Sequence, residues 1–127
     1  MMRDFALRFI EALLALDLPA LTSTLADDVL WHLPPFAKRP PLQGRDAVLT
    51  FVQQAQAAYY EPGTLSLEPE MVVADSDSAA VLGTLRGRTI RGKPYENCYS
   101  FVFRIADGRV VEAWELLDTA HLLAQMR

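Results

Sequence analysis

The second half of the chain contains four β-prone runs separated by short turn sequences, and this pattern restricts the fold more than any other feature. The runs cover residues 65–74, 79–90, 95–105 and 110–117. The segments between them read Asp-Ser-Asp-Ser, Arg-Gly-Lys-Pro and Ala-Asp-Gly-Arg, and such sequences are typical of hairpin turns. The sequence therefore predicts four long antiparallel strands.

The first half of the chain has the apolar spacing of amphipathic helices. This spacing predicts a first helix over residues 4–16, a short second helix over 18–25 and a third helix over 45–60. A short strand is predicted over 29–33, and Pro34-Pro35 ends it because proline cannot donate to a β-ladder. Together these elements predict an α+β fold, in which the N-terminal helices pack in a strongly curved, mostly antiparallel sheet.

Length and charge exclude several classes of function. A chain of 127 residues is long enough for one packed core, so we expect one domain. Its net charge of −4 argues against nucleic acid as a partner, because a nucleic-acid reader normally carries a basic face. No apolar run approaches the ~18 to 20 residues that span a bilayer, and no signal-peptide pattern is visible. We therefore expect a cytoplasmic protein without a membrane partner.

The residues that usually hold cofactors are missing from the sequence. Cys98 is the single cysteine, which excludes an internal disulfide and a zinc-binding thiolate cluster; we expect it to be buried in a strand. There is no His-x-x-x-His spacing, no glycine-rich phosphate loop and no nucleophilic serine motif. We expect neither a metal nor another cofactor.

The alternation of side chains along residues 95–105 predicts which face is inside. The odd positions carry mostly aromatic and apolar side chains and are expected to face the interior; they are Tyr95, Asn97, Tyr99, Phe101, Phe103 and Ile105. On the other face, Cys98 and Val102 are too apolar for a fully wet surface. A homodimer formed through this sheet face is the simplest cover.

The order of these elements resembles that of polyketide-cyclase-like (SnoaL-like) proteins in the nuclear transport factor two-like superfamily, on its ketosteroid-isomerase-like branch. The resemblance rests on the segments 25–29 (Leu-Ala-Asp-Asp-Val), 44–48 (Gly-Arg-Asp-Ala-Val) and 101–118. It covers nearly the whole chain and implies a single SnoaL-like domain over residues 1–127. It also implies a cystatin-like cone with a mostly apolar pocket, and dimerisation through the sheet. Function varies within this fold, so the pocket residues need a separate argument.

The catalytic residues of two relatives in this superfamily are not all present in this sequence. Where ketosteroid isomerase has polar catalytic groups, this sequence has Phe9, Leu33 and Phe101, and apolar side chains can neither donate to an enolate nor accept a proton. Limonene-epoxide hydrolase is similar over residues 41–48 and in the last strand. Its acid, arginine and second acid correspond to Glu115, Arg86 and the position of Arg88, so this triad is incomplete and epoxide hydrolysis is disfavoured.

Glu115 is the leading candidate for catalysis. It shares one strand face with Val111, Ala113 and Leu117, so this face is expected to look inward. Desolvation there would raise the pKa of Glu115 toward the range useful for acid/base work. Alternatively, Arg86 or Arg88 pairs with this carboxylate.

His32 is the second acid/base candidate. It follows Trp31 on a short strand, so only one of these two side chains can face the pocket, and a histidine bonded at the strand edge is the alternative. Asn97 could orient a ligand carbonyl or bond to the neighbouring backbone. The candidate substrate-binding residues are Trp31, Asn97, Tyr99, Phe101, Arg86, Phe9 and Tyr59.

The sequence thus predicts a protein that binds an apolar or aromatic small molecule. If it is an enzyme, it performs cofactor-free isomerase, cyclase or dehydratase chemistry with Glu115 and His32 as acid/base groups. The alternative is a non-catalytic ligand carrier or dimeric interaction module.

Overall fold

The computed structural model describes residues 1–126, and its six strands form one sheet in the order β2-β1-β6-β5-β4-β3. Neighbouring strands are antiparallel except β1 and β6, which are parallel. The elements in chain order are α1 (Met2–Ala15), α2 (Leu18–Thr24), β1 (Leu25–His32), the 3-10 turn η1 (Pro35–Ala37), β2 (Leu42–Gln43), α3 (Arg45–Tyr59), β3 (Ser66–Ala74), β4 (Ser78–Arg88), β5 (Pro94–Ala106), β6 (Arg109–Leu117) and α4 (Thr119–Gln125).

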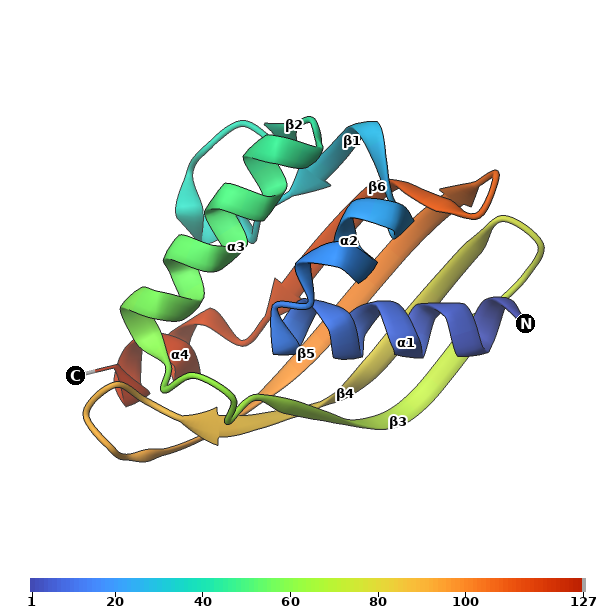
Figure 1. Cartoon of the computed structure of the whole chain (residues 1–127). Helices are drawn as coiled ribbons and strands as arrows, with labels where there is room; N and C mark the ends of the chain where they lie inside the picture. Colours follow the sequence, from blue (N-terminus) through green and yellow to red (C-terminus); the bar gives the residue numbers. More distant parts are fainter. Residues whose placement is uncertain (127) are drawn as a thin grey trace.

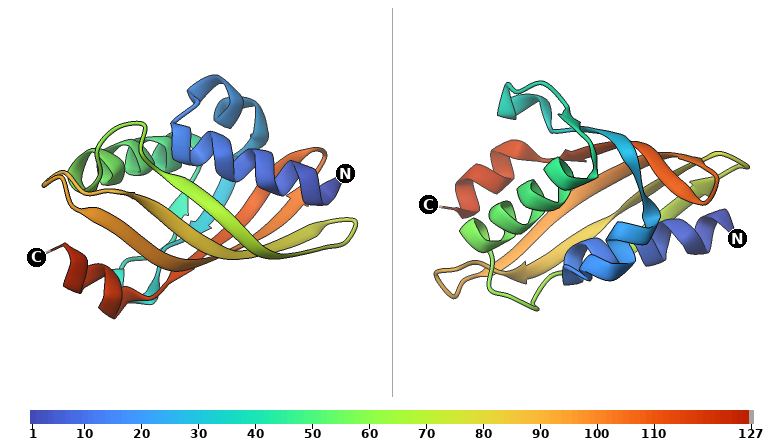
Figure 2. Two further views of the ribbon diagram at one scale, coloured as in Figure 1. Left: turned by 90° about the horizontal axis from the view of Figure 1, so that it is seen from below. Right: turned by 45° about the horizontal axis from the view of Figure 1, so that its top comes forward.

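The helices and the sheet form two layers (Figure 1). Helices α1, α2 and α3 lie over one face of the sheet, and the long strands bend around them (Figure 2). The predicted α+β fold with helices in a curved, mostly antiparallel sheet is confirmed. No helix within residues 1–126 is long and apolar enough to cross a membrane.

Aspartate side chains cap the N-termini of the two short helices α2 and α4. The Asp17 side chain accepts a hydrogen bond from the Ala20 N–H at 3.2 Å and so caps α2. In the same way Asp118 accepts from the His121 N–H at 3.0 Å and starts α4. This last helix was missed in the sequence, although an aspartate followed by apolar residues at helical spacing is a typical helix start.

The predicted inward face of β5 is confirmed. Tyr95, Asn97 and Tyr99 are buried, as are the following odd positions of the strand. The even positions point to the outer face of the sheet, and Cys98 is exposed there, so the prediction of a buried cysteine is wrong. Cys98 occupies an even position of β5, whereas the core side chains occupy the odd positions. The general tendency of cysteine to be buried does not reveal this difference.

The outer face of the sheet also carries exposed apolar side chains. They come from several strands and include Met71, Val73, Leu82 and Leu116. Such a face is compatible with the expected dimer contact, and the homodimer stays a prediction.

Gly83 on β4 lies directly against the backbone of its partner residue Pro69 on β3. A Cβ on this residue would lie 2.5 Å from the Glu68 carbonyl oxygen, beside a register irregularity between Pro69 and Met71. The added Cβ would meet the Glu68 carbonyl oxygen and the Pro69 Cα, and neither can move aside because both belong to the backbone. We therefore expect Gly83→Ala to lower the free energy of unfolding by about 1–3 kcal/mol, measured by urea denaturation. The control is Thr84→Ala, where the side chain points to the other face. Equal losses in the two variants would show that the close approach is not the cause.

Candidate functional site

A cavity of about 340 Å³ lies between the helical layer and the inner face of the sheet. Its size is in the range of small-molecule sites. Most of its wall is apolar, with contributions from Leu13, Leu33, Phe51, Val52, Leu85, Phe101, Leu117 and Leu122. The polar side chains in the wall are Gln56, Tyr59, Tyr60, Tyr99 and Glu115. A ligand here would meet few polar groups, and each would therefore affect its orientation strongly.

Glu115 lines this cavity from β6, on the inward side that the alternation predicts. Burial among apolar side chains raises the pKa of its carboxyl from 4.5 to about 7, and the Trp31 side chain, a donor to the carboxylate, partly opposes this shift. A carboxyl with this pKa exists in both protonation states near neutral pH. It can therefore accept a proton from a ligand and return it.

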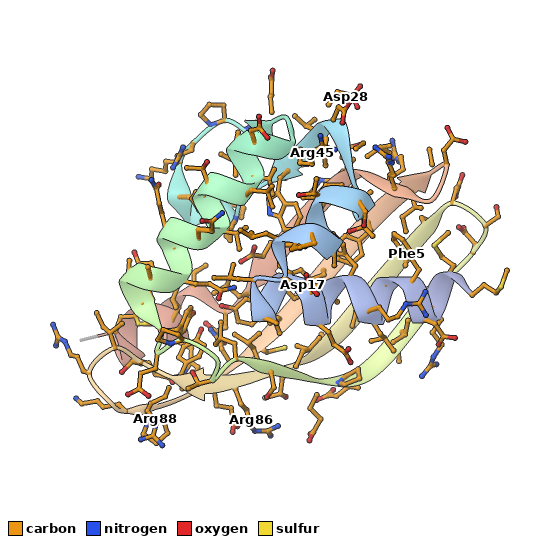
Figure 3. The ribbon with its side chains drawn as sticks, in the orientation of Figure 1. Phe5, Asp17, Asp28, Arg45, Arg86 and Arg88 are labelled. Carbon is orange, nitrogen blue, oxygen red and sulfur yellow. The ribbon has the colours of Figure 1, made fainter. Side chains whose placement is uncertain are left out.

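The expected partner arginines of Glu115 lie elsewhere. The Arg86 Nε is 3.1 Å from Glu96 Oε2 and Arg88 Nε is 3.5 Å from Glu61 Oε2. Both arginines point away from the helical layer (Figure 3). The predictions that Arg86 binds substrate and that either arginine pairs with Glu115 are therefore wrong. The even positions of β4 face outward, while Glu115 faces inward from β6.

His32 lies on the outer face of the sheet, so the prediction that it acts in the pocket is wrong. Its Nε2 is 2.7 Å from Glu112 Oε2, and its ring stacks on Trp114 at 4.8 Å between centroids. The parallel pairing of β1 with β6 sets this outcome, because it places His32 opposite Trp114. Trp31 takes the inward position, with 1% of its surface exposed. His32 and Glu115 thus lie on opposite faces and cannot act on one ligand.

The remaining aromatic candidates divide between core and cavity. Phe9 packs edge-on against Phe103 at 5.1 Å and lies 6.2 Å from the Trp31 ring, outside the cavity wall. Tyr99 and Phe101 belong to the wall itself. Tyr59 also reaches the wall but is 47% exposed, which places it at the rim.

Asn97 is buried behind the cavity wall. Its Nδ2 donates to the Asp118 carbonyl and to the Tyr95 hydroxyl, both at 3.0 Å, and its Oδ1 accepts from the Cys98 N–H at 2.8 Å. The side chain therefore forms hydrogen bonds with the neighbouring backbone, as one of the two hypotheses from the sequence proposed. It also donates a hydrogen bond to one tyrosine hydroxyl.

Tyr60, like Gln56, is a polar wall residue that is absent from the candidates chosen from the sequence. Its hydroxyl oxygen lies 3.5 Å from that of Tyr99, which in turn lies 3.3 Å from that of Tyr95. Burial raises the pKa of both Tyr60 and Tyr99 well above the ordinary value, so both hydroxyls stay protonated at neutral pH. The charge of Glu115 adds to the rise at Tyr60, which places the two groups within electrostatic reach.

Metal-binding geometry is not found among residues 1–126. No three side chains of the His, Cys, Asp or Glu types come together in a way that could hold an ion. The arrangement that remains is a carboxyl and neutral phenols in an apolar cavity.

Comparisons with known proteins agree with this architecture. The SnoaL-like domain profile matches residues 6–113. The structure is similar to that of IdmH from Streptomyces antibioticus, a proposed polyketide cyclase, with 28% identity, a TM-score of 0.79 and coverage of 96% of this chain and 95% of IdmH. A loop-truncation variant of IdmH has 29% identity and a TM-score of 0.82, with both chains covered completely.

An NTF2-like protein from Burkholderia pseudomallei is also similar, with 27% identity and a TM-score of 0.77 over 91% of this chain and 89% of that protein. No curated protein matches the chain by sequence.

Proposed function

Because this chain belongs to the SnoaL-like domain family of the NTF2-like superfamily, we propose that its cavity binds an apolar or partly aromatic carbonyl compound and that Glu115 transfers a proton on it. The observation that carries this proposal is one inward carboxyl in an apolar cavity, with its pKa raised to about 7. The reaction is of the isomerase or cyclase kind and uses no cofactor.

The proposed proton transfer uses the ionised and the protonated forms of the Glu115 carboxyl in turn. Ionised Glu115 takes a proton from the carbon next to the ligand carbonyl, and the electron pair of the broken C–H bond moves into an enolate. Where the ligand has a double bond between its β and γ carbons, the enolate extends over it as a dienolate, and protonated Glu115 returns the proton to the γ carbon, which isomerises the ligand to the conjugated carbonyl compound. In a cyclisation the enolate carbon instead attacks a second carbonyl, and Glu115 protonates the new alkoxide. A pKa near 7 suits both directions at neutral pH.

The similarity to IdmH supports the cyclase form of this chemistry, because polyketide cyclisation is the activity proposed for IdmH. The apolar cavity wall supports a ligand with rings or long apolar segments.

The proposal is tested with 2-tetralone, a bicyclic ketone whose α-protons exchange with solvent. We expect the protein to accelerate deuterium incorporation in D₂O, followed by proton NMR, and kcat/KM to rise with pH through about 7 as Glu115 ionises. Glu115→Gln should lower the exchange kcat/KM roughly 10²-fold, because an amide cannot accept the proton.

Two outer-face residues provide matched controls for this experiment. Glu112→Gln removes a carboxylate from the same strand, and His32→Asn removes the other acid/base candidate; both should leave exchange unchanged. Exchange that persists in Glu115→Gln would overturn the proposal. Saturable binding of 2-tetralone without any acceleration would instead favour the non-catalytic carrier.

A further inference from the structure

Behind the cavity, a chain of hydrogen bonds runs from Asn97 through Tyr95 and Tyr99 to Tyr60. The contacts of Asn97 determine which group donates in each of the following links. The Asp118 carbonyl can only accept and the Cys98 N–H can only donate, so their bonds at 3.0 and 2.8 Å fix which end of the Asn97 amide is nitrogen. The same nitrogen lies 3.0 Å from the Tyr95 hydroxyl oxygen, which must accept. The Tyr95 hydroxyl is thereby left with its own hydrogen to donate.

Tyr99 is the acceptor available for that hydrogen. The two hydroxyl oxygens lie 3.3 Å apart, and Tyr95 is only 2% exposed. If Tyr99 donated to Tyr95 instead, the Tyr95 hydrogen would be buried without a partner among the described residues, which costs about 1–3 kcal/mol. Tyr99 therefore accepts, and its hydrogen points toward Tyr60 or the cavity.

The last link of the chain is the weakest. The Tyr99 and Tyr60 oxygens lie 3.5 Å apart, which is longer than an ordinary hydroxyl hydrogen bond of about 2.5–3.0 Å. Both residues line the cavity. A ligand oxygen placed near these hydroxyls could replace the long contact and accept from both.

We propose that Tyr60 and Tyr99 form a two-donor site for a ligand carbonyl oxygen, and that Asn97 and Tyr95 act as positioning residues that direct the Tyr99 hydrogen toward this site. Preorganised donors of this kind stabilise the charge that develops on an enolate oxygen. The inference rests on the proposed function in placing the carbonyl ligand in the same cavity as Glu115. It differs from the isomerase arrangement, whose polar positions are occupied here by Phe9, Leu33 and Phe101.

The carbonyl stretching frequency of bound 2-tetralone tests the donor site directly. In the wild type we expect a shift to lower wavenumber relative to the ketone in hydrocarbon solvent. Tyr60→Phe should reverse much of this shift and weaken 2-tetralone binding roughly 3- to 10-fold. Tetralin, which has the same rings without the oxygen, should bind both proteins equally. Equal losses for both ligands, an unchanged frequency, or no saturable binding of 2-tetralone would overturn the inference.

Tyr95→Phe tests the direction of the chain. This variant keeps both donors but removes the hydroxyl that donates to Tyr99, so the Tyr99 hydroxyl is no longer held in one orientation. The carbonyl shift should therefore decrease although no cavity residue has changed. His32→Asn is the control, because His32 lies on the outer face of the sheet against Glu112 and Trp114, and it should leave the frequency unchanged. Circular dichroism checks that each variant is folded. A full shift in folded Tyr95→Phe would refute the positioning role.

The two proposals fail in different ways. Glu115→Gln should lower the deuterium exchange kcat/KM roughly 10²-fold and keep a carbonyl shift to lower wavenumber, because Tyr60 and Tyr99 are intact. A shifted carbonyl in a wild type that does not exchange protons would overturn the proposed function and leave the donor site standing. Deuterium exchange without a carbonyl shift would overturn the donor site and leave the proposed function standing.

Discussion

The wild-type protein is expected to lose about 3 kcal/mol of stability as the pH rises from 4.5 to about 7, because Glu115 titrates at 4.5 when unfolded and at about 7 when folded. Between these values the folded state binds more protons than the unfolded state, so the free energy of unfolding falls with rising pH. It should be level for this group below 4.5 and above about 7.

Urea denaturation over this pH range measures the effect. In Glu115→Gln the decline should disappear, because the amide does not titrate. Glu112→Gln should retain it, since this carboxylate lies on the outer face against His32. Asp75 does not interfere: the Ser78 hydroxyl holds its pKa below the ordinary 3.8, so its stabilisation is lost only as the pH falls below that value. Identical slopes in wild type and Glu115→Gln would contradict the raised pKa.

Phe9→Ala is expected to lower the free energy of unfolding by about 3–5 kcal/mol, the range for truncating a fully buried aromatic side chain. Phe9 is 2% exposed and packs between Trp31 and Phe103. Removing its ring leaves a void that the rigid sheet and α1 cannot close. Since the ring lies outside the cavity wall, 2-tetralone affinity of the folded variant should change little.

Phe51→Ala is the matched comparison, because the ring of Phe51 is part of the cavity wall and only partly buried. We expect a smaller stability loss and a roughly 10-fold weaker binding of 2-tetralone, from the apolar contact that the ligand loses. Urea denaturation and a binding titration of both variants separate the two roles. If Phe9→Ala weakened binding more than Phe51→Ala, Phe9 would be a ligand contact rather than core.

Much of the architecture could be predicted because its signals are local. The strands β3 to β6 start and end within one or two residues of the predicted runs, since turn residues mark their boundaries. Helices α1 and α3 are similarly close to prediction. The first strand extends back to Leu25 because it pairs with β6, a contact that no local pattern encodes.

The candidate site was only partly visible in the sequence. Alternation along β6 was sufficient to select Glu115, but the inward direction of Trp31 depends on the register between β1 and β6. Tyr60 follows the last residue of α3 and approaches Tyr99 only because the helix packs over the sheet. Two residues that are 39 positions apart carry no common pattern in the sequence.

The sequence alone therefore determined the α+β fold, the inward face of β5 and the one inward carboxyl of β6, because turn chemistry and the two-residue period of strands act over short distances. The tertiary structure alone decided that His32, Arg86 and Arg88 face away from the cavity, and that Asn97, Tyr95, Tyr99 and Tyr60 form one chain of hydrogen bonds. The physical reason is that strand register and helix docking depend on packing over the whole core, whereas a local pattern specifies only which side chains share a face.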